Sequence, residues 1–369
     1  MDTKDSNTEF STPGVMLPDT SARPIDPEVA DLTNGAGAAT IVPPPGVTEA
    51  KKSPTPLQDS LRRLRRDVRA MISICVIGVF VLIALIGPFI YQHIGGTYDS
   101  TFHGKIGPGV YHTYNNQELD RLDELPSAQY WLGTDDIGRD ILARLMQGML
   151  ISLSVAVLVE VMDITLGILV GVLAGYYGGW IDQLLARFTD IMFAFPGLLF
   201  AILLTGIFGG WADDNLSKIP IIGPNGNARL LLVSFALAFT TWPLMARYVR
   251  GQTLQLKEQQ FVEAARTSGT TSVGIILRHI IPNLFSIVVV VATLDISATI
   301  IGEAGISLLG LGVKPPGSSI GLMIASASQF VDTHPWEVLV PSVVLAIIVL
   351  SFSFFGDGLR DAFDPRSKD

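Results

Sequence analysis

Hydrophobic positions along this chain are gathered into long windows that contain no Asp, Glu, Lys or Arg. Five of these windows are 17 to 29 residues long and occupy positions 70–98, 164–181, 191–212, 230–246 and 338–356. A helix needs about 20 apolar residues to cross a bilayer core of about 30 Å, whereas apolar runs of about 10 to 14 are typical of buried soluble helices. The recurrence of such windows in one chain predicts a polytopic membrane protein.

The windows predict an all-α membrane protein with six transmembrane helices. We place these helices at 71–93, 149–174, 185–209, 229–249, 284–311 and 338–356. The composition agrees with this fold class, because 49% of the residues are hydrophobic and only 16% are charged. Soluble domains carry about 25% charged residues.

The remaining segments divide the chain into four regions. Residues 1–57 hold nine of the 22 prolines and no amphipathic period, which predicts a disordered cytoplasmic tail. Residues 58–93 combine a basic segment with the first span, and 94–148 form an external segment. Residues 149–369 form a core with five spans, in which 250–283 is a cytoplasmic loop.

The distribution of Lys and Arg predicts the orientation in the cytoplasmic membrane. With the N-terminus inside, cytoplasmic segments hold 18 of the 25 basic residues and external segments hold 7. This bias places both termini in the cytoplasm. Five arginines stand before the first span, at 62, 63, 65, 66 and 69. They indicate either an anchor on anionic membrane lipid or a topology signal, and both interpretations give the same orientation.

The net charge of −9 gives no indication of a nucleic-acid partner. More than half of the 34 acidic residues lie before residue 68 or between 99 and 140, outside the predicted spans. A single cysteine, Cys75, excludes an intrachain disulfide.

The second span carries Gly167, Gly171 and Gly175 at four-residue spacing. Glycines along one stripe let another helix approach closely, which is how helices associate inside a membrane. The stripe therefore predicts a tight helix pair, although glycine is in any case frequent in membrane helices.

The loop at 250–283 has the pattern of a helix, a turn and a second helix. Gly269 can end the first helix, and Pro282 stands at the entrance to the next span. The first helix exposes small residues, including Ala264 and Ala265. Such a surface is suited to docking against another protein or to lying flat on lipid.

The spacing within this loop resembles the EAA loop of bacterial binding-protein-dependent ABC importers. The loop contains the triplet Glu263-Ala264-Ala265. Gly269 stands six positions after Glu263, and Pro282 stands thirteen positions after Gly269. His279 stands where the general pattern has Ile.

Further blocks resemble the dipeptide/oligopeptide/nickel permease family, and specifically its second, C-type subunit. These blocks are 132–140, 242–269, 278–283, 302–304 and 309–316. The resemblance covers residues 62–362.

The resemblance implies a permease subunit that moves peptides or a similar small solute. It also implies the partners: a homologous permease as heterodimer partner, two ATPase subunits and an extracellular substrate-binding protein. The loop would form a coupling helix in a groove of an ATPase subunit, with Glu263, Ala264, Ala265, Gly269 and Pro282 as its motif residues. This chain has no G-x-x-x-x-G-K-[ST] phosphate loop. We therefore expect no cofactor here, with ATP and Mg bound by the partner ATPases, and no enzyme activity in this chain.

Carboxylates inside spans are candidate pathway residues, because each costs about 2.5–3.5 kcal/mol to insert. The candidates for a hydrated pathway are Asp163, Asp295 and Glu303. Glu160 is three positions before Asp163 and therefore lies on the same face of the second span. Four alternatives stay open. In the first, the carboxylates form hydrogen bonds between helices or lie at span ends near the lipid headgroups. In the second, a secondary transporter uses them to carry protons. In the third, the chain is a structural scaffold, which would need no carboxylates inside the membrane. In the fourth, an intramembrane protease uses Asp163 and Asp295 as a dyad.

Charged residues before the second span are candidates for contact with the binding protein. Arg139, Asp140 and Arg144 either make this contact or pair with each other. His103 and His112 have no acidic or thiol partner at ligand spacing, so no metal site is predicted.

Overall fold

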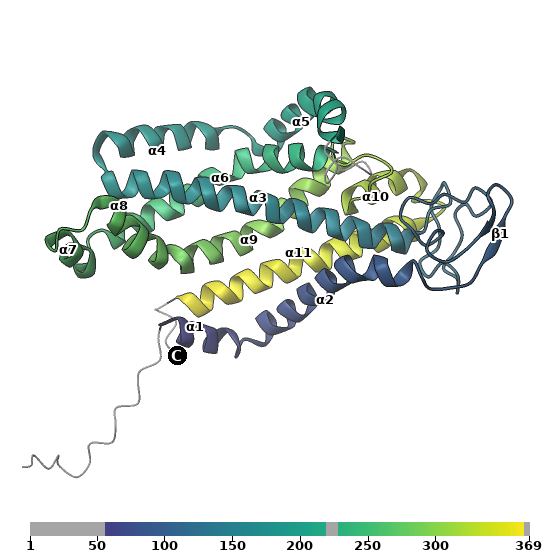
Figure 1. Cartoon of the computed structure of the whole chain (residues 1–369), viewed down its shortest axis with the longest axis horizontal. Coiled ribbons are helices and arrows are strands. Elements are labelled where there is room, and N and C mark those ends of the chain that lie inside the picture. The colour runs from purple at the N-terminus through teal and green to yellow at the C-terminus, as the bar shows by residue number, and fades with distance from the viewer. Residues whose placement is uncertain (1–55, 219–227, 365–369) are drawn as a thin grey trace, which may run out of the picture. The chain divides into compact units, whose positions relative to one another are not determined.

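The computed structural model describes residues 56–218 and 228–364, all within the unit Pro54–Asp369. The tail predicted at 1–57 lies outside the described residues except for its last two positions. The elements, in chain order, are α1 Pro56–Leu64, α2 Val68–Tyr91, β1 Tyr98–Ser100, β2 Gly104–Ile106, α3 Ile141–Tyr177, α4 Gly179–Ala194, α5 Gly197–Asn215, η2 Leu216–Lys218, α6 Ala228–Leu256, α7 Gln260–Thr267, α8 Ser272–Ile275, η4 Ile276–Ile280, α9 Ile281–Leu308, α10 Ile320–Ala327, η5 Ser328–Phe330 and α11 Pro335–Phe363 (Figure 1).

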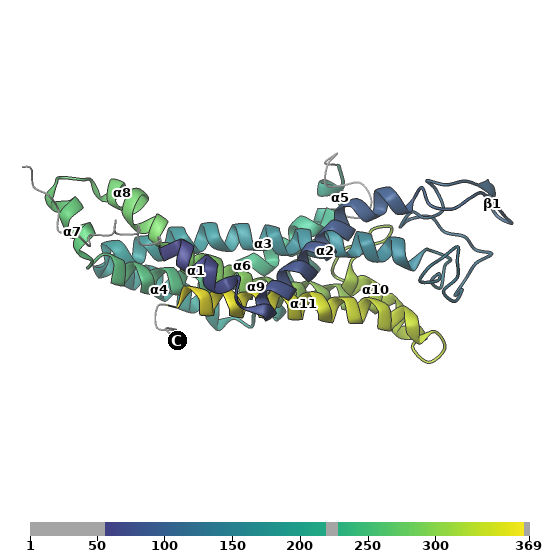
Figure 2. The same ribbon diagram turned by 90° about the horizontal axis from the view of Figure 1, so that it is seen from below.

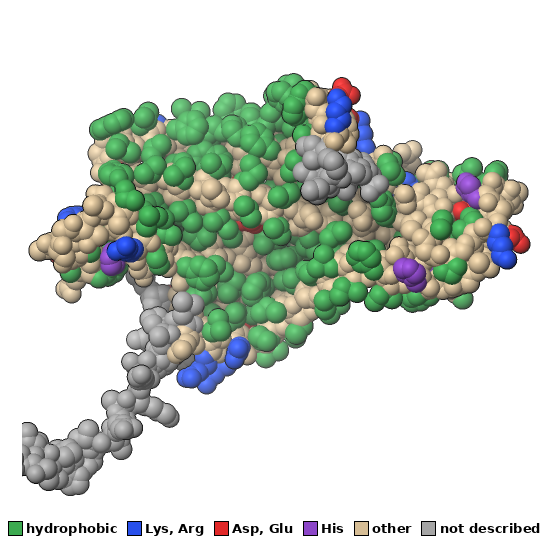
Figure 3. All heavy atoms as spheres, in the orientation of Figure 1, with side chains coloured by type: hydrophobic (Ala, Val, Ile, Leu, Met, Phe, Trp, Pro, Cys, Tyr) green, Lys and Arg blue, Asp and Glu red, His purple; other side chains and the backbone are tan. Residues whose placement is uncertain are grey.

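Six helical segments of the described residues are long and apolar enough to cross a membrane, which confirms the predicted fold class. These segments are Val68–Tyr91, Ile141–Tyr177, Gly197–Lys218, Ala228–Leu256, Ser272–Leu308 and Pro335–Phe363. Hydrophobic side chains cover most of the visible face, and the charged ones gather toward its ends and edges (Figure 3). This distribution is the one that a lipid environment requires.

The third predicted span, 185–209, is wrong in its position. The helix breaks at Phe195 and Pro196, and the candidate span begins at Gly197. Proline lacks the N–H that a continuous helix needs, and it forces the preceding residue into extended backbone. Phe195 has φ −75° and ψ 135°.

The helix before this break, α4, lies against α6 and is held there by ion pairs. Arg250 donates to both oxygens of Asp182 at 2.5 and 2.8 Å. Arg247 donates to Asp190 at 2.8 Å. The predicted third span therefore contained part of a charged, amphipathic helix.

The second span is longer than predicted at its N-terminal end. α3 starts at Ile141, and the Asp140 carboxylate caps it by accepting from the backbone N–H groups of Leu142 and Ala143 at 2.9 and 3.1 Å. The segment between α2 and α3 is therefore 92–140 instead of 94–148. It contains the antiparallel pair β1–β2.

The most extensive helix contact among the described residues is that of α3 with α6, and the glycine stripe predicted from sequence lies in it. A Cβ on Gly171 would lie 2.6 Å from the Ala246 carbonyl oxygen, and one on Gly175 would lie 2.7 Å from Cβ of Thr253. The two backbones approach this closely because the glycines have no side chains.

Two groups of elements lie at opposite ends of the helices. α7, α8, α1 and the carboxyl end of α11 lie at one end, and the β1–β2 segment lies at the other (Figures 1 and 2). The α7–α8 turn and the 92–140 segment are therefore on opposite sides of the membrane-spanning part.

Candidate coupling helix and membrane carboxylates

The short helix α7 is fixed to the end of the bundle by one buried side chain. Val262 is fully buried. It belongs to a hydrophobic cluster that joins α3, α6, α8 and α9, with Val172, Val249, Ile275, Ile280 and Leu284 among its members. Through this cluster, α7 is attached to the end of the bundle.

The turn after α7 is closed by a two-bond Schellman arrangement. The N–H of Gly269 donates to the Arg266 carbonyl at 3.0 Å, and the N–H of Thr270 donates to that of Ala265 at 3.1 Å. Gly269 has φ +79°, a conformation in which a Cβ is unfavourable. The prediction that Gly269 ends this helix is confirmed.

The motif residues divide into an exposed set and a packed set. Glu263, Ala264 and Gly269 are exposed. Ala265 is half-buried against the hydrophobic cluster. Pro282 is the second residue of α9, so it lies outside α7. The expectation that Ala265 belongs to the exposed small-residue surface is therefore corrected.

Three membrane carboxylates from α3 and α9 come together. One ligand oxygen each from Glu160, Asp163 and Asp295 lies within 4.8 Å of the others. Glu160 and Asp163 are 5% and 0% exposed, and neither oxygen of either group has a hydrogen-bond partner among the described residues. Asp295 is half-buried. Two buried carboxylates without donors, close to a third, form a site that favours a cation or shared protons.

Glu303 is separate from this trio and has bonded oxygens. Ser152 of α3 donates to Oε2 at 2.7 Å, and Ser307 of α9 donates to Oε1 at 2.6 Å. Ser319 donates to the Ser307 hydroxyl at 3.2 Å. Glu303 is 1% exposed. These contacts correspond to the helix-to-helix alternative, and the expectation that Glu303 lines a pathway stays a prediction.

The charged residues before α3 are interior, not surface, residues. Arg139, Asp140 and Arg144 are 5%, 1% and 3% exposed. Arg139 Nε donates to Asp135 at 2.8 Å, and Arg144 donates to the same carboxylate. Arg139 and Arg144 therefore pair with Asp135 and not with Asp140, and the contact with a binding protein stays a prediction.

Asp140 also has a partner that sequence spacing did not indicate. Nδ1 of His112 lies 2.5 Å from its second oxygen, and the imidazole ring is buried. Because 28 residues separate the two, only the folded 92–140 segment brings them together. His112 thus fixes the start of α3.

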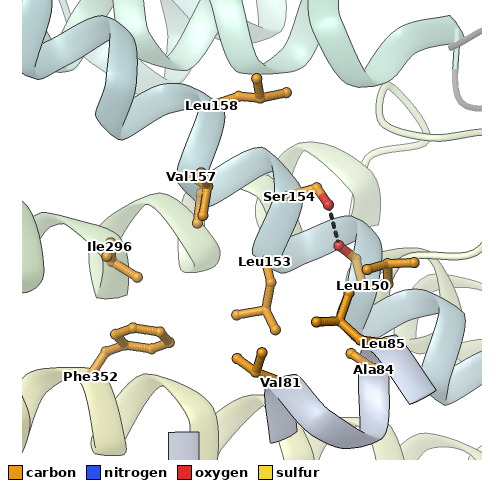
Figure 4. A pocket seen from close by; sticks show the side chains of 11 residues that line it. Val81, Ala84, Leu85, Leu150, Leu153, Ser154, Val157, Leu158, Ile296 and Phe352 are labelled. Carbon is orange, nitrogen blue, oxygen red and sulfur yellow. Dashed lines mark hydrogen bonds between the residues drawn. The ribbon is translucent and has the colours of Figure 1, made fainter. Parts of the chain in front are cut away.

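An open pocket of about 510 Å³ lies between α2, α3, α9 and α11. Its walls are apolar side chains such as Val81, Leu153 and Phe352, and the Ser154 hydroxyl is already bonded to the Leu150 carbonyl (Figure 4). With no free polar group, these walls offer a polar solute no hydrogen bond. The pocket is therefore a poorer candidate substrate site than the carboxylate trio.

Six candidate spans among the described residues, a short helix packed at one end and a buried polar site indicate a polytopic membrane protein of the transport class. The comparisons with known proteins then identify its family. Residues 167–369 match the binding-protein-dependent transport system inner membrane component family, and residues 55–104 match the N-terminal transmembrane domain of oligopeptide transport permease C.

Two similar relatives extend the likeness over most of the chain. The dipeptide transport system permease protein DppC of Alkalihalophilus pseudofirmus is 33% identical, covering 85% of this chain and 91% of the relative. The glutathione transport system permease protein GsiD of Escherichia coli is 36% identical, covering 85% of this chain and 92% of the relative.

The chain belongs to the binding-protein-dependent transport system inner membrane component family. It is a multi-pass membrane permease subunit of an ABC importer, and the resemblance stated from sequence is confirmed. The Glu263-Ala264-Ala265 motif belongs to this family.

Proposed function

We propose that the exposed face of α7 docks on an ATPase subunit and that the carboxylate trio binds the charged amino group of a peptide substrate. The docking proposal rests on the way in which the α7 residues divide into packed and exposed side chains. Val262 and Ala265 are packed into the bundle, while Glu263 and Ala264 face outward. A rigidly attached helix with a small-residue outer face passes a displacement of its partner on to the spans as rigid-body motion.

The proposed orientation places α7, α1 and both termini in the cytoplasm. The arginines between residues 62 and 69 stand at the N-terminal end of α2, which lies at the same end of the helices as α7 (Figure 2). Basic residues next to a span favour the cytoplasmic side. The 92–140 segment then faces the external binding protein.

The proposed assembly contains this chain, a homologous permease as heterodimer partner, two ATPase subunits and an external binding protein. The membership in a binding-protein-dependent importer family supports it. ATP and Mg bind the ATPase subunits in this proposal, because this sequence has no phosphate loop.

The docking proposal is tested by site-specific cross-linking in the assembled importer. With Cys75→Ser as the background, a photoreactive maleimide on Ala264→Cys is expected to cross-link to an ATPase subunit. The control is Asn115→Cys, exposed in the 92–140 segment, which should give no ATPase product. Absence of an ATPase adduct at position 264 in an intact complex contradicts the docking proposal.

The relatives transport a dipeptide and glutathione, according to their names. Peptides of this size share a charged amino terminus, which a cluster of carboxylates attracts. The half-buried Asp295 gives the trio its most accessible carboxylate. We therefore assign Asp163 and Asp295, together with Glu160, to the translocation pathway.

An Asp295→Asn importer is expected to take up a free dipeptide about tenfold more slowly, while an N-acetylated dipeptide is much less affected. A tenfold change corresponds to about 1.4 kcal/mol, a modest fraction of a charge–charge interaction in a buried site. The measurement is ATP-driven uptake into proteoliposomes containing the whole complex. Equal slowing of both peptides would instead indicate a purely structural role for Asp295.

A further inference from the structure

A second cluster of ligand-type side chains lies away from the carboxylate trio, near the start of α11. It consists of Asp123 from the 92–140 segment, His334 just before α11, and Glu337 in the first turn of α11. One ligand atom of each lies within 4.8 Å of the others. Nδ1 of His334 is 3.7 Å from Oδ1 of Asp123 and 3.2 Å from the Thr333 hydroxyl.

The central carboxylate of this cluster has an unpartnered oxygen. Glu337 is 3% exposed, and its Oε1 has no hydrogen-bond partner among the described residues. Oδ1 of Asp123 is also buried and has no hydrogen-bond partner among the described residues. A buried carboxylate oxygen without a donor is costly, because burial removes its water and nothing replaces it.

The surroundings of Glu337 add negative charge. A small cavity of about 10 Å³ beside it is also lined by Asp135, Asp136 and Arg144. Burial and the neighbouring Asp135 raise the pKa of Asp136. Arg144 donates to Asp135 and makes no ion pair with Glu337 among the described contacts. The site therefore has an excess of carboxylates over cations.

A buried glutamate of the 92–140 segment, Glu118, shows what a carboxylate with satisfied hydrogen bonds looks like. Glu118 is fully buried, with Asn116 donating to it at 2.9 Å and His103 lying 3.2 Å away. Although burial by itself raises its pKa, hydrogen bonds including those of Asn116 and His103 hold the pKa of Glu118 below its usual value. Glu337 lacks such donors at Oε1.

We propose that Asp123, His334 and Glu337 bind one divalent transition-metal ion, with zinc the best fit. An imidazole nitrogen together with two carboxylates is a donor set that suits Zn²⁺, whereas Ca²⁺ and Mg²⁺ prefer oxygen ligands alone. Three protein ligands leave a further position for water. Zinc bonds are about 2.0–2.2 Å long, so the three ligand atoms, which lie within 4.8 Å of one another, would draw closer together around the ion.

Metal binding at this site ties two parts of the fold that are distant in sequence. The backbone N–H of Asp123 donates to the Asp135 carbonyl at 3.1 Å, so Asp123 is attached to the segment leading into α3. His334 and Glu337 belong to the start of the last span. The ion would clamp the 92–140 segment to α11, so that Zn²⁺ raises the thermal stability of the protein.

The test is calorimetric titration of the tag-free full chain in lipid nanodiscs with ZnCl2 and, separately, CaCl2. We expect one Zn²⁺ per chain, a higher Tm with Zn²⁺, and at least about tenfold weaker binding in Glu337→Gln. Asp123→Asn is the second variant, since Asn tolerates the positive φ of +50° at this position. Glu118→Gln is the control and should bind Zn²⁺ like the wild type.

Two results would overturn the proposal. One is the absence of stoichiometric Zn²⁺ binding, or tighter binding of Ca²⁺ than of Zn²⁺, by the folded wild-type chain. The other is undiminished Zn²⁺ affinity in both Glu337→Gln and Asp123→Asn.

Discussion

An Ala264→Asp importer is expected to lose at least about 30-fold in ATP-driven uptake while the permease still enters the membrane and folds. The new carboxylate projects from the exposed face of α7, where the proposal places the ATPase. Burying an unpaired charge at a closely packed interface costs 2 kcal/mol or more, which is about 30-fold or more in affinity. Loss of ATPase subunits on copurification is the direct measurement, with uptake as the functional one.

The structure selects Ala264 over its neighbours for this test. Ala265→Asp would place a charge against the hydrophobic cluster, and any residue at Gly269 would be strained by the φ of +79°. Ala264→Ser is the matched control, because it keeps the small volume and is expected to retain uptake within about twofold. Normal copurification and uptake in Ala264→Asp would contradict docking through this face.

A Gly171→Leu permease is expected to be destabilised by about 4 kcal/mol or more and to accumulate poorly. Even the Cβ of the new side chain would lie 2.6 Å from the Ala246 carbonyl oxygen and 2.7 Å from Cβ of Val249. The Ala246 carbonyl oxygen is part of the backbone and cannot rotate away from the new side chain, so α3 and α6 must separate. The measurement is the thermal unfolding of the purified chain, monitored by size-exclusion chromatography after heating.

Gly206→Leu in α5 is the control for this change. Gly206 is exposed, and a Cβ there would meet nothing within 4 Å. Its effect on stability should stay within about 0.5 kcal/mol. Similar losses in the two variants would show that leucine at any glycine of a span is harmful, and that the α3–α6 contact is not the cause.

The number of spans was predictable because it follows from local composition. Long apolar windows with few or no charges identify the crossings, and five of the six spans were placed with errors only at their ends. The third span was misplaced because the apolar character of a window does not reveal the helix break that a single proline causes. Pro196 divides α4 from α5, and only the contact of α4 with α6 explains why Asp182 and Asp190 are tolerated there.

The candidate sites were predictable in part, for a similar reason. Asp163 and Asp295 stood out because a carboxylate within an apolar run is rare, and the structure brings them together with Glu160. Glu303 has the same appearance in sequence, yet Ser152 and Ser307 satisfy both its oxygens. Burial and hydrogen bonding depend on neighbours from other helices, which no local pattern contains.

By itself, the sequence determined the fold class, the six-span plan, the glycine stripe and the family, because each is written in consecutive residues or at helical spacing. The tertiary structure decided which polar residues are free to act. It placed Arg139 and Arg144 on Asp135 in the interior, turned Ala264 outward and Ala265 inward, and joined Asp123 to Glu337 across more than 200 positions. The physical reason is that exposure, charge pairing and desolvation arise from contacts between segments that only folding brings together.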